Sequence, residues 1–241
     1  MQRNPELFLA VFIFIILFPV FLITGIFIFL TDFKNPFYVA DRVGIDGIKF
    51  KMFKFRSMRK VKSMIHIVST SETDIRITRI GRIIRKYKID EFSQIINVIL
   101  GNMGFVGPRP NVEEEIKLYT DIELKILNVK PGITDIASIV FSDLNAILRD
   151  CENVNLYYNQ FIRPWKSRLA LLYIDNKSFK LDIELMLLTI LNIINRKFTL
   201  NRLKNIVLHY SNDHSLAEVV ERKLKLYAFP PPGSNSIVME R

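Results

Sequence analysis

The stretch Lys88–Pro110 reads KIDEFSQIINVILGNMGFVGPRP and decides how this chain is interpreted. It places adjacent acids, Asp90 and Glu91, at the start of an apolar helical repeat for which Gly101 is a suitable end. The two prolines of the run Gly107–Pro110 exclude regular helix and central strand, so the backbone presents Arg109 stiffly. Since a guanidinium can bind two phosphate oxygens at once, the stretch combines acids with a phosphate-type arginine.

Each of these features has a structural and a functional interpretation. An acid at a helix N-terminus commonly caps free backbone N–H groups and complements the helix dipole, and Asp90 and Glu91 fit that role. The same end of a helix attracts phosphate, so an acid there can instead meet a phosphate or its metal. Arg109 is equally compatible with a rigid turn that carries an exposed arginine. Taken one by one, the residues leave both interpretations open.

An uncharged apolar segment, Leu7–Leu30, precedes this stretch and has Pro19 near its middle. It is long enough to cross a bilayer, which takes roughly 20 residues. It is a poor signal peptide because its charged leader is thin and no small-residue cleavage site follows. An ordinary spanning helix and a hairpin kinked at Pro19 both fit the flanking charges.

Composition limits the class of protein. The chain has 241 residues and a net charge of +10, enough for one medium domain with attachments. A basic domain tied to an apolar segment suits an anionic membrane surface, and nucleic acid is the alternative partner. Cys151 is the only cysteine, which excludes an intramolecular disulfide, and the three histidines are too scattered for a zinc site.

Between the apolar segment and the acid pair, the pattern predicts a β-hairpin, a loop and a helix. Phe37–Ala40 and the alternating run Ile48–Phe55 flank a glycine-containing turn. The lysines of this hairpin, Lys54 among them, form either a solvated face or a phosphate-facing edge. Residues 59–75 are polar and predict a flexible loop. Thr78–Lys86 predicts a basic amphipathic helix that is solvated or faces lipid.

The last third of the chain is less informative. Trp165 beside basic residues is compatible with a membrane headgroup position or with a packed core. Leu181–Ile194 is apolar but short for a span, so it predicts a buried or membrane-surface helix. Leu216–Leu226 predicts a charged helix, and the proline-rich tail after it predicts a non-helical, mobile end.

The joint order of these motifs resembles the bacterial sugar transferases, the small monotopic phosphoglycosyl transferases, over residues 3–195. Each motif is weak alone, but their order and spacing make the resemblance specific. The matching motifs are Pro19 in the membrane segment, Lys54–Met58, Thr78–Arg85, Ile89–Val98, Gly101–Pro110, Lys130–Thr134 and Leu172–Thr189.

The resemblance implies a fold and a location. We expect a mainly helical α+β protein with an N-terminal re-entrant membrane helix, a small β-hairpin and amphipathic surface helices. Residues 1–32 would form the re-entrant segment, broken at Pro19, and residues 33–197 a catalytic domain. Residues 198–241 would be an extension of unknown role. The protein would be monotopic in the bacterial inner membrane and face the cytoplasm.

The resemblance also implies a reaction. A nucleotide diphospho-sugar, usually a UDP-sugar, donates sugar-1-phosphate to polyprenyl (undecaprenyl) phosphate, which begins assembly of a surface glycan. Asp90 would be the nucleophile, and Glu91 would assist it. Both would help to hold Mg²⁺, the expected cofactor. Membrane lipid and downstream glycosyltransferases are further expected partners, and nucleic acid is not. The residues expected to bind phosphate or substrate are Arg109, Arg85, Lys54 and Arg56.

The sequence departs from the family pattern at several places. Ahead of the membrane segment, where the family often has a basic residue and an Asp, the nearest equivalents are Arg3 and Glu6. Phe18 stands where a serine usually precedes the membrane proline, and Asn102 replaces an acid, so Asn102 is not assigned to metal. Asp135–Ile139 replaces the common Gly-Trp-Ala-Gln-Val. These departures leave a non-catalytic scaffold or membrane-tethered binding protein as the alternative function.

Overall fold

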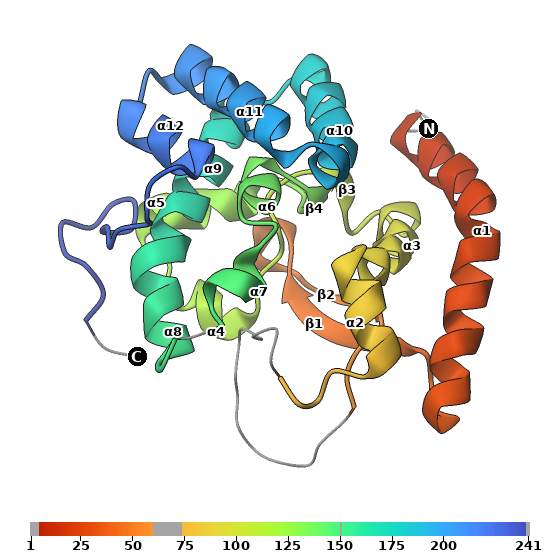
Figure 1. The fold of residues 1–241 in the computed structure, drawn as a ribbon. Helices are drawn as coiled ribbons and strands as arrows, with labels where there is room; N and C mark the ends of the chain where they lie inside the picture. The colour runs from red at the N-terminus through yellow and green to blue at the C-terminus, as the bar shows by residue number, and fades with distance from the viewer. Residues whose placement is uncertain (1–4, 60–73, 150, 240–241) are drawn as a thin grey trace.

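The computed structural model describes residues 5–59, 74–149 and 151–239. It confirms the predicted mainly helical α+β fold (Figure 1). The strands are β1 (Phe37–Val43), β2 (Lys49–Phe55), β3 (Gly104–Val106) and β4 (Gly132–Thr134). The helices are α1 (Pro5–Asp32), α2 (Arg79–Lys86), α3 (Ile95–Ile99), α4 (Glu113–Ile116), α5 (Asp121–Leu124), α6 (Ile136–Val140), α7 (Leu144–Ile147), α8 (Val154–Tyr157), α9 (Arg163–Asp175), α10 (Phe179–Ile194), α11 (Arg196–Ser211) and α12 (His214–Glu221). Short 3₁₀ or π turns are η1 (Ile45–Gly47), η2 (Ile89–Gln94), η3 (Lys125–Asn128) and η4 (Tyr158–Ile162).

The apolar segment forms one helix, α1, which continues through Pro19. The predicted break at Pro19 is therefore wrong as a local feature. A proline removes one backbone hydrogen bond, but the bonds on both sides can persist. Aromatic packing also joins the two halves, because the rings of Phe14 and Phe21 lie 5.6 Å apart on either side of Pro19. The re-entrant arrangement itself stays a prediction.

α1 contacts the rest of the protein near both of its ends (Figure 1). At its start, the Glu6 carboxylate accepts a hydrogen bond of 2.8 Å from the Phe105 amide in β3. At its end, Asp32 pairs with Arg56, which follows β2. Ala10 is fully buried between these two points.

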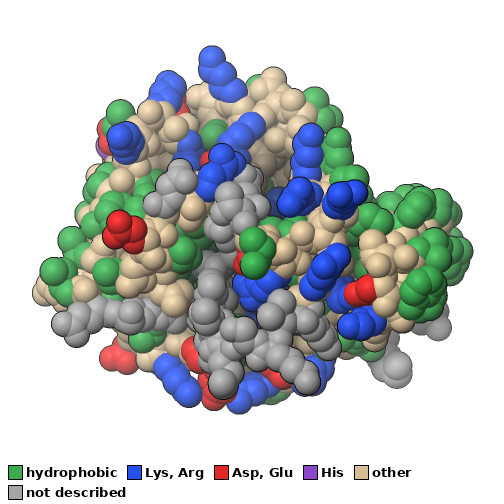
Figure 2. Space-filling model, turned by 60° about the horizontal axis from the view of Figure 1, so that its bottom comes forward, with side chains coloured by type: hydrophobic (Ala, Val, Ile, Leu, Met, Phe, Trp, Pro, Cys, Tyr) green, Lys and Arg blue, Asp and Glu red, His purple; other side chains and the backbone are tan. Residues whose placement is uncertain are grey.

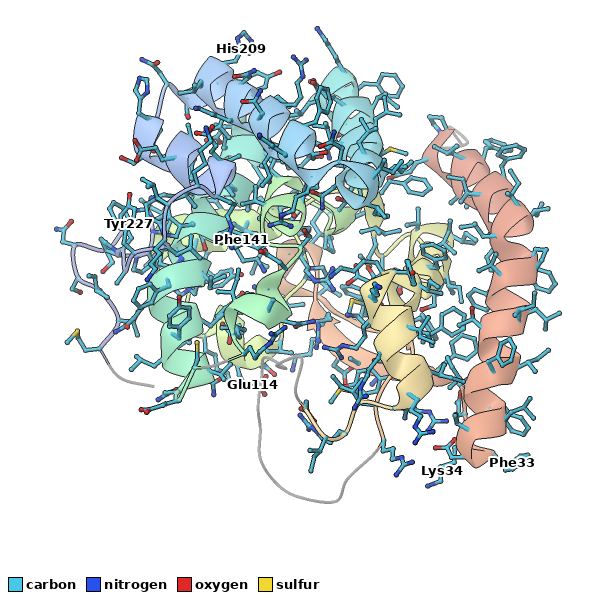
Figure 3. All side chains as sticks on the ribbon, viewed as in Figure 1. Phe33, Lys34, Glu114, Phe141, His209 and Tyr227 are labelled. Atoms are coloured by element: carbon cyan, nitrogen blue, oxygen red, sulfur yellow. The ribbon has the colours of Figure 1, made fainter. Side chains whose placement is uncertain are left out.

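The opposite side of α1 is apolar and uncovered. Its side chains project away from the molecule along the length of the helix, and Phe33 and Lys34 follow at its end (Figure 3). α1 is long and apolar enough to cross a membrane, and only 11% of its most apolar window is buried. Such a surface accounts for membrane association.

The predicted hairpin and basic helix are both confirmed. β1 and β2 are antiparallel and pair Phe37 with Phe55 and Tyr38 with Lys54. The Asn97 side chain joins α3 to this hairpin, donating to the Lys51 carbonyl at 2.7 Å and accepting from the Phe53 amide at 3.0 Å. Most of the predicted loop over residues 59–75 lies outside the described residues.

The helix after the loop, α2, approaches the hairpin closely. Thr78 caps it by accepting from the Gly81 amide at 2.8 Å. A Cβ at Gly81 would lie 1.9 Å from the Ser57 carbonyl oxygen, so only glycine allows this contact. The contact fixes where α2 lies relative to the chain that follows β2.

Two short parallel strands bring distant segments together. β3 and β4 pair Gly104 with Gly132 and Val106 with Thr134. The pairing continues past the strands, where the Gly107 amide donates to the Thr134 carbonyl at 2.9 Å. The rigid turn that carries Arg109 and the residue Asp135 therefore leave the same edge of this sheet.

The largest core unites α6 and α9 with α10, α11 and α12. Leu203 and Val220 from the predicted extension are fully buried in it. The described part of the predicted extension thus contributes side chains to the largest core. Trp165 is 1% exposed in the same core, which confirms the packed alternative for this residue and excludes the headgroup position.

The C-terminal tail is non-helical, as predicted, and it packs against the domain. Phe229 stacks on Trp165 with ring centroids 4.6 Å apart, and its amide donates to the Gln160 carbonyl at 3.0 Å. The Gln160 side chain in turn donates to the Val238 carbonyl at 2.7 Å. The predicted helix Leu216–Leu226 is present as the shorter α12.

α10 is amphipathic. Its buried side packs Leu181, Leu185 and Leu188 into the core. Its other side exposes large apolar residues at helical spacing: Phe179, Ile183, Leu187, Ile190 and Ile194. α10 is therefore neither fully buried nor a span, and its exposed side suits a membrane surface.

Candidate active site

The acid pair lies in a 3₁₀ turn rather than in an α-helix. Asp90 and Glu91 belong to η2, and α3 begins only at Ile95. Lys88 precedes the turn with a positive φ of 58°, and no side chain caps η2. The Asp90 carboxylate therefore does not cap a helix, which was one of the two roles that the sequence allowed.

Asp90 is 9% exposed, and its Oδ1 atom is buried without a hydrogen-bond partner in the described part of the chain. Both polar atoms of the Gln94 side-chain amide, also within η2, are likewise buried without a hydrogen-bond partner in the described part of the chain. Burial and then the charge of Glu91 raise the pKa of Asp90, while Lys54 and Arg85 act in the opposite direction. Buried polar atoms without partners are uncommon and mark candidate functional sites.

Glu91 is held by two cations. Both of its oxygens accept from Arg109, at 2.8 and 3.0 Å. The Nζ atom of Lys54 lies 4.0 Å from Oε1. Burial by itself would raise the pKa of Glu91, but Arg109 and Lys54 outweigh it and lower that pKa to about 2. Burial and Arg109 lower the pKa of Lys54 to about 8, against the opposing charge of Glu91.

Arg85 and Arg56, two of the residues predicted to bind phosphate, have different contacts in the structure. Among the residues that the structure describes, the Arg85 side chain makes one weak contact, at 3.5 Å with the Met58 sulfur, and its charge acts on Asp90. Arg56 is 7% exposed and is already bound. Its guanidinium donates to both Asp32 oxygens, at 2.5 and 2.6 Å, and to the Asn35 carbonyl at 2.8 Å.

The prediction that Arg56 binds substrate is therefore corrected. Its donors hold the end of α1 against β2. The motif shared with the family identified Arg56 as important but could not show that Asp32 is its partner. The structure brings Asp90, Glu91, Arg109, Lys54 and Arg85 together, and Arg56 is bound elsewhere.

Three charged residues of this site were not predicted as site residues. Arg42 in β1 acts electrostatically on Lys54 and Arg109. Asp135 is 2% exposed, and Lys166 in α9 interacts electrostatically with both Asp135 and Arg109. Asp135 stood out in the sequence only as a departure from the family. Arg42 and Lys166 gave no signal, because strand pairing and helix packing place them there.

The carboxylates can accommodate Mg²⁺ in a limited way. Within residues 5–59, 74–149 and 151–239, no group of three His, Cys, Asp or Glu could hold a metal ion. Mg²⁺ is, however, often bound by one or two carboxylates together with substrate phosphates and water. The unpartnered Oδ1 of Asp90 fits such a ligand. Glu91 fits it less well, because Arg109 binds both of its oxygens.

Basic side chains predominate around this site. Lys54, Arg85, Arg109 and Lys166 surround the buried acids, and Figure 2 shows Lys and Arg side chains gathered beside the apolar side of α1. Basic side chains beside an exposed apolar helix attract anions. The fold and the site thus define a membrane-associated protein with a buried carboxylate among phosphate-type cations.

The chain belongs to the bacterial sugar transferase family, whose sequence model matches residues 1–196. It is 34% identical to EpsL, an uncharacterised sugar transferase of Bacillus subtilis (strain 168), over 66% of this chain and 69% of EpsL. It is 34% identical to the undecaprenyl-phosphate glucose phosphotransferase of Komagataeibacter xylinus, over 78% of this chain and 35% of that protein. It is 33% identical to the UDP-glucose:undecaprenyl-phosphate glucose-1-phosphate transferase of Escherichia coli (strain K12), over 58% of this chain and 31% of that protein.

The matches to the last two relatives thus cover about a third of each protein. The family match ends at residue 196, where α11 begins. The core contributed by α11, α12 and the tail therefore lies almost entirely beyond the residues that the family model matches.

Proposed function

We propose that this protein is a phosphoglycosyl transferase that moves sugar-1-phosphate from a nucleotide diphospho-sugar to polyprenyl phosphate. The observation that carries the proposal is the Asp90 carboxylate, buried and unpartnered beside the Glu91–Arg109 ion pair. The printed activities of the E. coli and K. xylinus relatives support undecaprenyl phosphate as the acceptor, and the E. coli name supports a UDP-sugar donor.

In the first step, an oxygen of Asp90 attacks the sugar-linked phosphorus of the donor. The bond from this phosphorus to the bridging oxygen breaks, and the nucleoside monophosphate leaves with the electron pair. The product on the enzyme is an aspartyl-phosphosugar. Because Asp90 Oδ1 accepts no hydrogen bond in the described chain, its lone pairs are not engaged before the substrate arrives.

In the second step, a phosphate oxygen of polyprenyl phosphate attacks the same phosphorus. The bond from Asp90 to phosphorus breaks, and the carboxylate is restored. The lipid leaves as polyprenyl-diphospho-sugar, a substrate suited to glycosyltransferases that extend a surface glycan. Two steps let one small site accept a water-soluble donor and a lipid acceptor in turn.

The basic residues stabilise charge during both steps. Arg109 can bind two phosphate oxygens, and Glu91 fixes the plane of its guanidinium. Lys54 and Arg85 lie close enough to influence Glu91 and Asp90, and would neutralise further phosphate oxygens. Bound Mg²⁺ would neutralise the diphosphate, with Asp90 as its main protein ligand and Glu91 as a secondary one.

We also propose a monotopic arrangement on the cytoplasmic face of the inner membrane. The contacts of Glu6 with Phe105 and of Asp32 with Arg56 tie both ends of α1 to one domain, which favours an arrangement with both ends on one face. In a Gln2→Cys, Cys151→Ser protein, a membrane-impermeant thiol reagent added outside the inner membrane should leave position 2 unlabelled. Labelling in intact spheroplasts would contradict the arrangement.

The activity is tested with purified full-length protein in detergent, Mg²⁺, undecaprenyl phosphate and a panel of radiolabelled UDP-sugars. We expect label to move into the organic phase with at least one donor, and no transfer with Asp90→Asn. If no donor gives a lipid-linked product, the non-catalytic binding or scaffold function would replace this proposal.

A further inference from the structure

Lys166 lies in the first turn of α9, far in sequence from the acid pair. It is partly buried, and its Nζ atom lies 5.6 Å from the centroid of the Tyr158 ring. Lys166 has no role in the two reaction steps proposed above.

The residues around Lys166 fix the rotation of α9. Arg163 pairs with the fully buried Glu123, and the Ser167 hydroxyl donates to the same carboxylate at 2.6 Å. Trp165 is buried under Phe229 on another side of the helix. Since three positions within one turn are bound or packed, the direction of the Lys166 side chain is fixed by the fold and not by solvent.

α9 packs against α6, which Asp135 caps, so Lys166 lies on the helix next to that residue. The charges that act on Lys166 come from Arg109, Asp135, Glu115 and Glu91, which lie on separate elements. The pairing of β3 with β4 brings two of these, Arg109 and Asp135, to one sheet edge. Lys166 is thus a second cation placed near Arg109.

Lys166 makes no hydrogen bond or ion pair with any residue that the structure describes. Burial and then the neighbouring Arg109 lower the pKa of Lys166 to about 8, although Asp135, Glu115 and Glu91 act in the opposite direction. An ammonium that has lost water and lies near another cation is stabilised when an anion binds between them.

We propose that Lys166 is a second phosphate-binding residue, which together with Arg109 holds the diphosphate of the nucleotide-sugar donor. The proposal rests on the function proposed above. A diphosphate suits the arrangement because it offers oxygens on two phosphorus atoms to two separate cations.

The test compares Lys166→Met, which removes the charge but keeps the length, with Lys166→Arg, which keeps the charge. We expect Lys166→Met to raise the donor KM about tenfold, with the acceptor KM unchanged and without any loss in Tm, because the buried ammonium does not stabilise the fold at pH 7. Lys166→Arg should recover the donor KM to within about threefold. Lys180→Met, on the exposed start of α10, is the matched control and should behave as the wild type.

Calorimetric titration of the same full-length proteins with UDP-sugar gives a readout that needs no turnover. Equal donor affinity in the wild type and Lys166→Met would overturn the proposal, as would an equal loss in Lys166→Arg. If Lys166→Met does not fold, Lys166→Gln carries the same expectations. Absence of lipid-linked product from a wild type whose donor binding depends on Lys166 would instead contradict the proposed function alone.

Discussion

Arg109 and Glu91 form a two-point ion pair, with Nη1 3.0 Å from Oε2 and Nη2 2.8 Å from Oε1. The pair joins the rigid turn after β3 to η2, so it connects the two halves of the stretch Lys88–Pro110. It orients the guanidinium next to Asp90 before a substrate is present. Substitutions at either residue therefore test orientation as well as charge.

Arg109→Lys should lower kcat/KM for the donor by about 100-fold while the Tm changes little. A lysine keeps the charge but cannot bind both Glu91 oxygens and a phosphate in one plane. Steady-state kinetics of lipid-linked product formation measures the effect. Arg202→Lys, in an exposed ion pair with Glu184, is the control. An Arg109→Lys enzyme with wild-type kcat/KM would show that two-point geometry is unnecessary.

Arg56→Gln should destabilise the protein without changing the donor KM. The substitution leaves Asp32 without its partner at the end of α1, so the Tm should fall. Thermal unfolding and donor kinetics are measured on the same preparation. Lys51→Gln, which breaks an exposed pair with Asp41, should change stability by less than about 1 kcal/mol. A raised donor KM in Arg56→Gln at unchanged Tm would restore its substrate-binding role.

Asp90→Asn should raise the Tm at pH 7, although it abolishes activity. Burial raises the pKa of Asp90 in the folded protein above its unfolded value, near 3.8. The folded state therefore binds the proton more tightly, and stability falls as the pH rises through the interval between these two values. At pH 7 the ionised carboxylate therefore lowers the free energy of unfolding, and the neutral asparagine does not.

The gain in Tm should shrink as the pH approaches 3.8, where the wild-type carboxyl takes up its proton. Melting curves of both proteins from pH 4 to pH 8 measure the difference in Tm at each pH. The titration of the other acids affects both proteins alike, so it does not contribute to this difference. Asp41→Asn, at an exposed position, is the control. A lower Tm for Asp90→Asn than for the wild type at pH 7 would mean that the carboxylate is stabilising.

Truncation after residue 197 should prevent folding, because it removes Leu203, Val207 and Val220 from the main core. A milder variant, Phe229→Ala, should cost about 2 kcal/mol through loss of the stack on Trp165. Leu224→Ala, at a 68% exposed position, should change stability by less than about 0.5 kcal/mol. A soluble, cooperatively unfolding truncated protein would show that the extension is dispensable for the fold.

Local patterns predicted the local elements well. The alternation over Ile48–Phe55 and the turn before it were enough for the hairpin, and the spacing in Thr78–Lys86 was enough for α2. The apolar repeat after Asp90 predicted a helix, but it could not distinguish a 3₁₀ start from an α-helical one. That difference depends on how η2 packs against β2, which is a tertiary effect.

Contacts between residues that are far apart in the chain could not be predicted from the sequence. Nothing near Arg56 in the sequence indicates that Asp32 binds it, so the sequence alone predicts that the Arg56 guanidinium binds substrate. Lys166 enters the site because Glu123 and Phe229 fix α9 from two directions, and neither contact has a sequence signature. The proline-rich tail predicted irregular backbone correctly, but its packing depends on the aromatic ring of Trp165.

The proposal that Asp90 carries the phosphosugar is tested by mass spectrometry of acid-quenched full-length protein after incubation with UDP-sugar and Mg²⁺, without the lipid acceptor. We expect an adduct with the mass of one sugar phosphate on the peptide that contains Asp90, absent from Asp90→Asn and discharged by undecaprenyl phosphate. An undiminished adduct in Asp90→Asn would contradict the proposal.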